Sequence, residues 1–82
     1  MINPVVKVRK EKGLSVTQLA ILAGVTSARI RQVERGDAVR LSGNVLGALE
    51  QLGYDPERLN RDYTVWRSAQ IAKILRWAEK GA

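Results

Sequence analysis

Apolar residues recur every three or four positions along most of this chain, which is the spacing of amphipathic helices. The first such segment opens at Asn3-Pro4, where asparagine can cap a helix and proline fits its first turn, and it ends at Gly13. A second segment runs from Ser15 to Gly24 and a third from Thr26 to Gly36. Each of these two opens on a hydroxyl that can accept from backbone amides and ends on a glycine. The sequence therefore predicts three short helices joined by tight turns.

The second and third predicted helices each have apolar residues on the side that is expected to face the core. Ser15 and Gln18 have the spacing of a capping box at the start of the second helix. Ile30 and Val33 lie one turn apart on the third helix, so they are expected to face the core. The second helix is expected to turn its apolar residues inward, and these are Leu19, Ala20, Leu22 and Ala23.

The rest of the chain continues the helical pattern. Ser42 caps a predicted fourth helix that ends at Gly53 and carries Val45, Leu46, Leu49 and Leu52 at core spacing. Gly43 and Gly47 lower its intrinsic helix propensity, and we expect them to permit close packing of the backbone. Asp37 to Arg40, before this helix, reads as a loop.

Two further helices are predicted towards the C-terminus. Asp55-Pro56 starts a short fifth helix that ends near Arg61. Asp62 or Thr64 caps a last helix that runs to about Lys80 and is apolar around much of its circumference. No segment alternates as a strand would, and no repeat is visible, so the fold class is all-α. We expect a five-helix domain over residues 1–61 and an additional C-terminal helix within residues 62–82.

The charge of the chain narrows the classes of partner that it can bind. The 82 residues contain 14 Lys plus Arg against 8 Asp plus Glu, a net charge of +6. This excess favours a polyanionic partner, first nucleic acid and second an acidic membrane surface, although a solvated basic surface is also compatible with it.

The residues that catalysis and metal binding need are scarce. The chain has no cysteine and no histidine. It therefore lacks thiolate chemistry, the commonest general base and the commonest metal ligand. We find no phosphate-binding glycine loop, so we expect no enzyme, no catalytic residue, no metal and no cofactor. The N-terminus has no long apolar run, which favours a cytoplasmic protein without a membrane span.

Val16 to Arg35 reads as a helix-turn-helix. Two helices that cross at a steep angle need a small residue at the crossing, here Ala20, and a turn residue that tolerates positive φ, here Gly24. Ile30 and Val33 then hold the second helix of the pair on the first. The alternative is an ordinary corner between two helices of a small bundle.

The segment "VRKEKGLSVTQLAILAGVTSARIRQVERG", Val8 to Gly36, followed by "LEQLGY", resembles the phage repressor and Cro-type helix-turn-helix family, that is, lambda repressor-like DNA-binding domains. The resemblance covers about Val5 to Leu59. It implies a lambda repressor-like fold and binding to double-stranded DNA. It also implies an ion pair between Arg9 of the first helix and Glu34 of the third. Glu34 would otherwise repel phosphates, and a bidentate pair with Arg9 removes that difficulty.

The resemblance assigns DNA contacts residue by residue. Base-reading positions of the family fall on Ser27, Ala28, Arg31 and Gln32. Phosphate contacts are expected from Thr17, Gln18, Arg29, Arg35 and Arg40. The family commonly has glutamine at the first position of the second helix, where this chain has Val16. Thr17 or Gln18 supplies that contact here, or the amides at the helix N-terminus do so unaided.

The last helix lies beyond the usual core of the family, and three roles are compatible with its sequence. In the first, Trp66 packs onto the domain and the helix is structural. In the second, which we favour, the helix forms a seam with a second copy of the chain. In the third, its apolar face lies on an acidic membrane. The seam consists of Val65, Trp66, Ala69, Ala72 and Leu75 or Arg76.

These expectations define one hypothesis and one alternative. We expect a sequence-specific transcriptional regulator, a repressor, that binds an inverted-repeat operator as a homodimer through residues 26–35. The alternative is the antitoxin of a toxin–antitoxin pair, in which the C-terminal helix binds a toxin protein. A helical scaffold that never binds DNA is a further rival.

Overall fold

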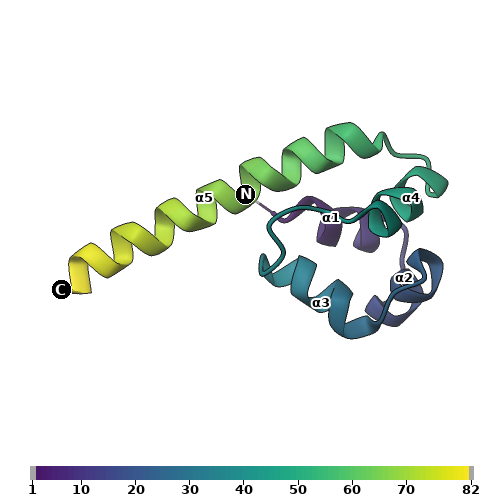
Figure 1. Cartoon of the computed structure of the whole chain (residues 1–82), viewed down its shortest axis with the longest axis horizontal. Helices are drawn as coiled ribbons and strands as arrows, with labels where there is room; N and C mark the ends of the chain where they lie inside the picture. Colours follow the sequence, from purple (N-terminus) through teal and green to yellow (C-terminus); the bar gives the residue numbers. More distant parts are fainter. Residues whose placement is uncertain (1, 82) are drawn as a thin grey trace.

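The computed structural model describes residues 2–81, and within them it has five helices and no strand. They are α1 (Pro4–Glu11), α2 (Val16–Ala23), α3 (Ser27–Arg35), α4 (Gly43–Gln51) and α5 (Pro56–Gly81). The first four helices and the start of α5 form a rounded unit, and the rest of α5 extends away from it as a single rod (Figure 1). The all-α fold class is confirmed.

The predicted caps start the short helices. The side chains of Asn3, Ser15, Thr26 and Ser42 each accept a hydrogen bond from an amide in the first turn. Ser15 and Gln18 form the full capping box, in which the Gln18 side chain also accepts from the Ser15 amide at 2.9 Å. These bonds satisfy amides that have no partner inside the helix, so they fix where each helix begins.

The core lies between the five helices and is apolar. Fully buried residues come from every helix, for example Val5, Leu19, Ile30, Leu49 and Tyr63. Leu22, predicted to face inward, is 38% exposed, because Leu19, Ala20 and Ala23 already define the inner face of α2. The expectation for α4 is also wrong, since a Cβ at Gly43 or Gly47 would meet no atom within 4 Å.

One helix replaces the two that were predicted at the C-terminus. α5 runs without a break through residues 61 and 62. Neither proposed cap acts as one: Thr64 donates its hydroxyl to the Asn60 carbonyl at 3.0 Å, and Asp62 lies 4.0 Å from Arg58 one turn earlier. Leu59, Tyr63 and Trp66 continue one buried face across the expected boundary, so the core stabilises an uninterrupted helix.

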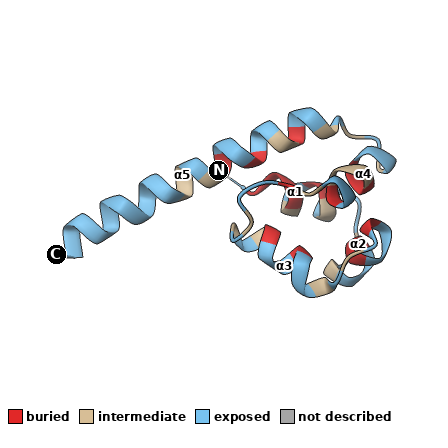
Figure 2. Ribbon diagram, in the orientation of Figure 1, coloured by how far each residue is buried: buried red, intermediate tan, exposed pale blue. Residues whose placement is uncertain are grey.

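α5 has 26 residues, which corresponds to about 39 Å of helix and accounts for most of the 44 Å length of the molecule. In its first half one face of α5 is buried against the domain, whereas residues 71–81 are exposed all round (Figure 2).

Candidate nucleic-acid interface

The turn between α2 and α3 sets the angle at which the two helices meet. Gly24 ends α2 with φ +70°, a left-handed conformation that most residues adopt only with strain. Two residues later Thr26 accepts from the Arg29 amide at 3.2 Å and starts α3. Ala20 is buried, and its small side chain suits a close crossing of the two helices. This arrangement is a helix-turn-helix.

α3 has one face in the core and one in solvent. Ile30 and Val33 are at most 1% exposed and anchor the helix. Ala28, Arg31, Gln32 and Arg35 follow the spacing i, i+3, i+4, i+7, so they share the opposite face, and all four are exposed. This outward face carries two guanidinium groups, one amide and one methyl group, which are groups that can hydrogen-bond or contact base edges and phosphates.

The N-terminal ends of α2 and α3 lie side by side. The Ser27 hydroxyl donates to the Thr17 hydroxyl across 3.4 Å, which brings a predicted base contact next to a predicted phosphate contact. Gln18 is exposed beside them. Its carbonyl oxygen is used in the capping box, so its NH₂ group is the part that can donate to a phosphate.

Arg9 and Glu34 form a two-bond ion pair. Arg9 Nε lies 2.6 Å from Glu34 Oε2, and a terminal nitrogen of Arg9 donates to Glu34 Oε1 at 3.1 Å. The other terminal nitrogen donates to the Leu14 carbonyl at 3.0 Å. The two side chains are only 15% and 13% exposed. The pair ties α1 to α3 and keeps the Glu34 charge off the outward face.

The remaining predicted phosphate contacts surround α3. Arg29 and Arg40 are exposed. Arg35 is also exposed, and its guanidinium lies 3.0 Å from the Asp37 carboxylate. Exposed pairs of this kind contribute little stability, so Arg35 can exchange Asp37 for a phosphate at small cost.

The C-terminal end of α3 is held by residues that the sequence analysis did not assign to the site. Asn3, used as a cap by its Oδ1, donates from Nδ2 to the carbonyls of Val33 (3.1 Å) and Glu34 (3.0 Å). Tyr63 donates its hydroxyl to the Ala38 carbonyl at 2.8 Å, with the Val33 carbonyl 3.1 Å away. The last carbonyls of a helix need such partners, but no spacing in the sequence identifies them.

Burial raises the pKa of Tyr63 above its usual value. The nearby Arg67 charge opposes this effect and the Asp37 charge adds to it. The hydroxyl is therefore protonated at neutral pH and can act as the donor to Ala38.

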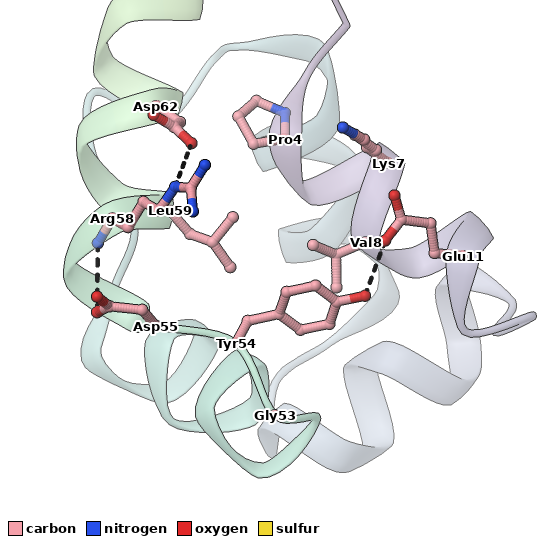
Figure 3. A pocket seen from close by; sticks show the side chains of 10 residues that line it. All are labelled: Pro4, Lys7, Val8, Glu11, Gly53, Tyr54, Asp55, Arg58, Leu59 and Asp62. Atoms are coloured by element: carbon pink, nitrogen blue, oxygen red, sulfur yellow. Dashed lines mark hydrogen bonds and ion pairs between the residues drawn. The ribbon is translucent and has the colours of Figure 1, made fainter.

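A hollow of about 350 Å³ lies elsewhere, between α1, the α4–α5 turn and the start of α5 (Figure 3). Val8, Leu59 and Tyr54 give it apolar walls, and the Tyr54 hydroxyl donates to Glu11 at 2.9 Å. Its lining also includes two cations and three carboxylates, and no residue of α2 or α3. Carboxylates repel phosphates, so this hollow is not part of the nucleic-acid interface.

The residues predicted for a dimer seam do not share one environment. Trp66 is 7% exposed and packs on Tyr63 with ring centroids 5.7 Å apart, so it belongs to the core of the single chain. Almost none of its surface remains for a second copy. Val65, Ala72 and Leu75 are exposed, and Ala69 is half-buried at the edge of the domain.

Comparison with known proteins agrees with this geometry. A family model described as helix-turn-helix matches residues 5–59, which span α1 from its second residue, all of α2 to α4 and the start of α5. No curated protein and no solved structure matches the chain. The chain belongs to the helix-turn-helix family of the lambda repressor and Cro type. It is a DNA-binding transcription regulator, and this family is a regulatory family and not an enzyme family.

Within residues 2–81, no helix combines the length and the apolar character that a membrane span requires. The same residues contain no cluster of acidic side chains arranged to hold a metal ion.

Proposed function

We propose that the chain recognises a specific DNA sequence by inserting α3 into the major groove. The observation that carries this proposal is the division of α3 into a buried face, Ile30 and Val33, and an exposed face with Ala28, Arg31, Gln32 and Arg35. A helix supported in this way presents its side chains to a groove without rearrangement. The major groove is wide enough to admit an α-helix.

Each proposed base contact has a chemical basis. Gln32 can bond an adenine edge with its amide, and Arg31 can bond guanine with two N–H groups. Ser27 can bond several base edges, and Ala28 can contact a thymine methyl group. The base-reading set is thus Ser27, Ala28, Arg31 and Gln32.

Phosphate contacts would surround this set. Thr17 and Gln18 lie at the N-terminal end of α2, where free amides and the helix dipole favour an anion. Arg29 lies beside the outward face of α3, Arg35 lies at its C-terminal end, and Arg40 lies in the loop before α4. Because these cations displace counterions from the duplex, binding should weaken steeply as salt increases.

We further propose that the chain acts as a homodimer through the exposed half of α5. Ile71, Ile74, Leu75 and Ala78 follow the spacing i, i+3, i+4, i+7 and form one apolar stripe, the α5 stripe, whose three large residues are 44–63% exposed. Lys73, Arg76 and Lys80 lie on the opposite side of the helix. Two copies can therefore pair along the stripe without bringing these cations together.

The α5 stripe differs from the seam predicted from the sequence. The face with Val65, Ala69 and Ala72 continues into Arg76 and Lys80, so it becomes basic further along the helix. Leu75 borders both faces. We therefore assign the contact to the α5 stripe and not to the face of Ala72.

A two-fold dimer would bind an inverted repeat with half-sites separated by about one helical turn, roughly 34 Å. Such a dimer on an operator would act as a repressor by occluding it. The α5 stripe could instead bind a toxin protein, as the antitoxin alternative requires. Sedimentation of the purified chain separates the two, because only the homodimer forms without a second protein.

Duplex binding by single arginine variants tests the interface. Arg31→Gln should weaken binding to a mixed-sequence duplex at low salt by about tenfold, because a groove contact is lost. Arg58→Gln removes the same charge from an exposed position of α5, where Arg58 lies 4.0 Å from the Asp62 carboxylate, and this variant should bind DNA as the parent does. Equal losses for the two variants would indicate attraction by net charge alone and would refute the assigned interface.

A further inference from the structure

The loop between α3 and α4 is bonded along its length to α5. The Arg67 Nε donates to the Gly36 carbonyl at 2.9 Å, and the Tyr63 hydroxyl donates to the Ala38 carbonyl at 2.8 Å. The Asn60 side chain accepts from the Leu41 amide, the longest of the three bonds at 3.4 Å. Asn60, Tyr63 and Arg67 lie on successive turns of one helix face, and we name them the loop clamp.

All three clamp bonds go to backbone groups of the loop. They therefore fix the path of the chain from Gly36 to Leu41 without depending on the side chains of the loop. The clamp residues bond the loop in reverse order, from Leu41 at Asn60 to Gly36 at Arg67. The loop therefore runs antiparallel to α5. Arg40, the only basic residue in this loop, lies between two clamped positions.

The close contact at Gly36 supports the same arrangement. Gly36 has φ +89°, and a Cβ added there would lie 3.0 and 3.1 Å from two ring atoms of Trp66. The indole can approach the end of α3 this closely because the residue is glycine. In addition, the Arg67 cation lies at the C-terminal end of α3, where the helix dipole favours positive charge.

We propose that Tyr63 and Arg67 are positioning residues for DNA binding, which hold the loop so that Arg40 meets a phosphate when α3 occupies the groove. This proposal rests on the proposed DNA interface. Neither residue needs to touch DNA, because each acts through a loop carbonyl. The helix-turn-helix itself contains neither residue, since α2 and α3 end before Gly36.

Tyr63→Phe and Tyr54→Phe form a matched pair for the test. Each removes one hydroxyl and leaves an aromatic ring, but Tyr54 bonds Glu11 of α1 and not the loop. We expect Tyr63→Phe to weaken binding of the full chain to a labelled mixed-sequence duplex by about three- to tenfold, the range that loss of one hydrogen bond gives. Tyr54→Phe should bind as the parent does. Thermal unfolding of each variant ensures that binding is measured on folded protein.

Coupling to Arg40 distinguishes positioning from a general effect on the fold. In an Arg40→Gln background the further loss from Tyr63→Phe should nearly disappear, because the clamp then has no phosphate contact to position. Arg67→Gln should show the same dependence on Arg40, which provides a second variant should Tyr63→Phe fold poorly. Losses that multiply independently in the double variants would overturn the proposal.

The remaining outcomes separate this proposal from the proposed function. If Arg40→Gln weakens binding but Tyr63→Phe and Arg67→Gln bind as the parent does, the positioning role is wrong and the DNA interface stands. If the parent itself binds no duplex at low salt, the proposed function is wrong and this proposal is overturned with it.

Discussion

The two halves of α5 have similar apolar side chains but opposite surroundings. Leu59, Tyr63 and Trp66 of the first half are at most 8% exposed and complete the core of the domain. Ile74, Leu75 and Trp77 are 58–77% exposed. They belong to the second half, which extends beyond the domain and is exposed throughout (Figure 2).

This difference shows that apolar pattern alone does not define a core. The first half has a buried face because it packs against α1, α4 and the loop between α3 and α4, whereas the second half extends beyond the domain (Figure 1). Large apolar side chains that remain in water on so small a protein indicate a binding surface. We therefore assign the first half to the fold, and we propose that the second half binds a second copy of the chain.

Replacing one tryptophan in each half gives the largest expected contrast. Trp66→Ala should lower the free energy of unfolding by about 3–5 kcal/mol, because it removes a buried indole and leaves a cavity. Trp77→Ala should change it by less than about 0.5 kcal/mol when the protein is dilute enough to be monomeric. Urea unfolding measures both. Similar losses would mean that the second half also packs onto the domain.

The next contrast concerns the two faces of the second half. Ile74→Glu places a charge in the α5 stripe and should weaken self-association by about a hundredfold, since a buried unpaired charge is costly. Ala72→Glu places the same charge on the face predicted from the sequence and should leave association nearly unchanged. Analytical ultracentrifugation gives the dissociation constants. The reverse order would restore the face of Val65, Ala69 and Ala72 as the seam.

The next prediction concerns the Arg9–Glu34 ion pair between α1 and α3, which lies outside α5. Glu34→Ala should lower the free energy of unfolding by about 2–3 kcal/mol, because Arg9 is left largely buried without its partner. The same variant should change duplex affinity less than stability, since Glu34 is turned away from the outward face. Unfolding and duplex titration are measured on one preparation. Melting temperatures equal to the parent would contradict the bracing role.

The smallest effect is expected from alkaline pH. Burial raises the pKa of Tyr63, so the unfolded chain ionises first as the pH rises through about 10. The folded state therefore loses stability above that pH and is unaffected below it. Tyr63→Phe lacks this group and should lose less stability in that window, although Tyr54 titrates in both proteins. Identical stability profiles above pH 10 would show that Tyr63 does not contribute.

Much of the domain was predictable because its determinants are local. Ser15, Thr26 and Ser42 cap helices, and Gly24 ends one, through interactions within a few residues of sequence. The Arg9–Glu34 pair spans 25 residues and followed from the family resemblance. The helix-turn-helix could be predicted from the sequence both because its caps and turn are local and because the segment resembles a known family.

The failures have a different physical origin. Asp62 and Thr64 have the chemistry of caps, but continuity of the buried face from Leu59 to Trp66 outweighs it. Tyr63 and Arg67 bind backbone carbonyls, which carry no signature in the sequence of the loop. Such contacts depend on how α5 crosses the loop, which only the assembled fold determines.

Selection of duplexes from a random pool tests the central claim most directly, when the parent and Gln32→Ala are compared. If the outward face of α3 reads bases, the parent should enrich an inverted repeat, and the variant should lose preference at one base position in each half-site while retaining the others. Enrichment of the same sequence by both proteins, or of none by the parent, would contradict the account.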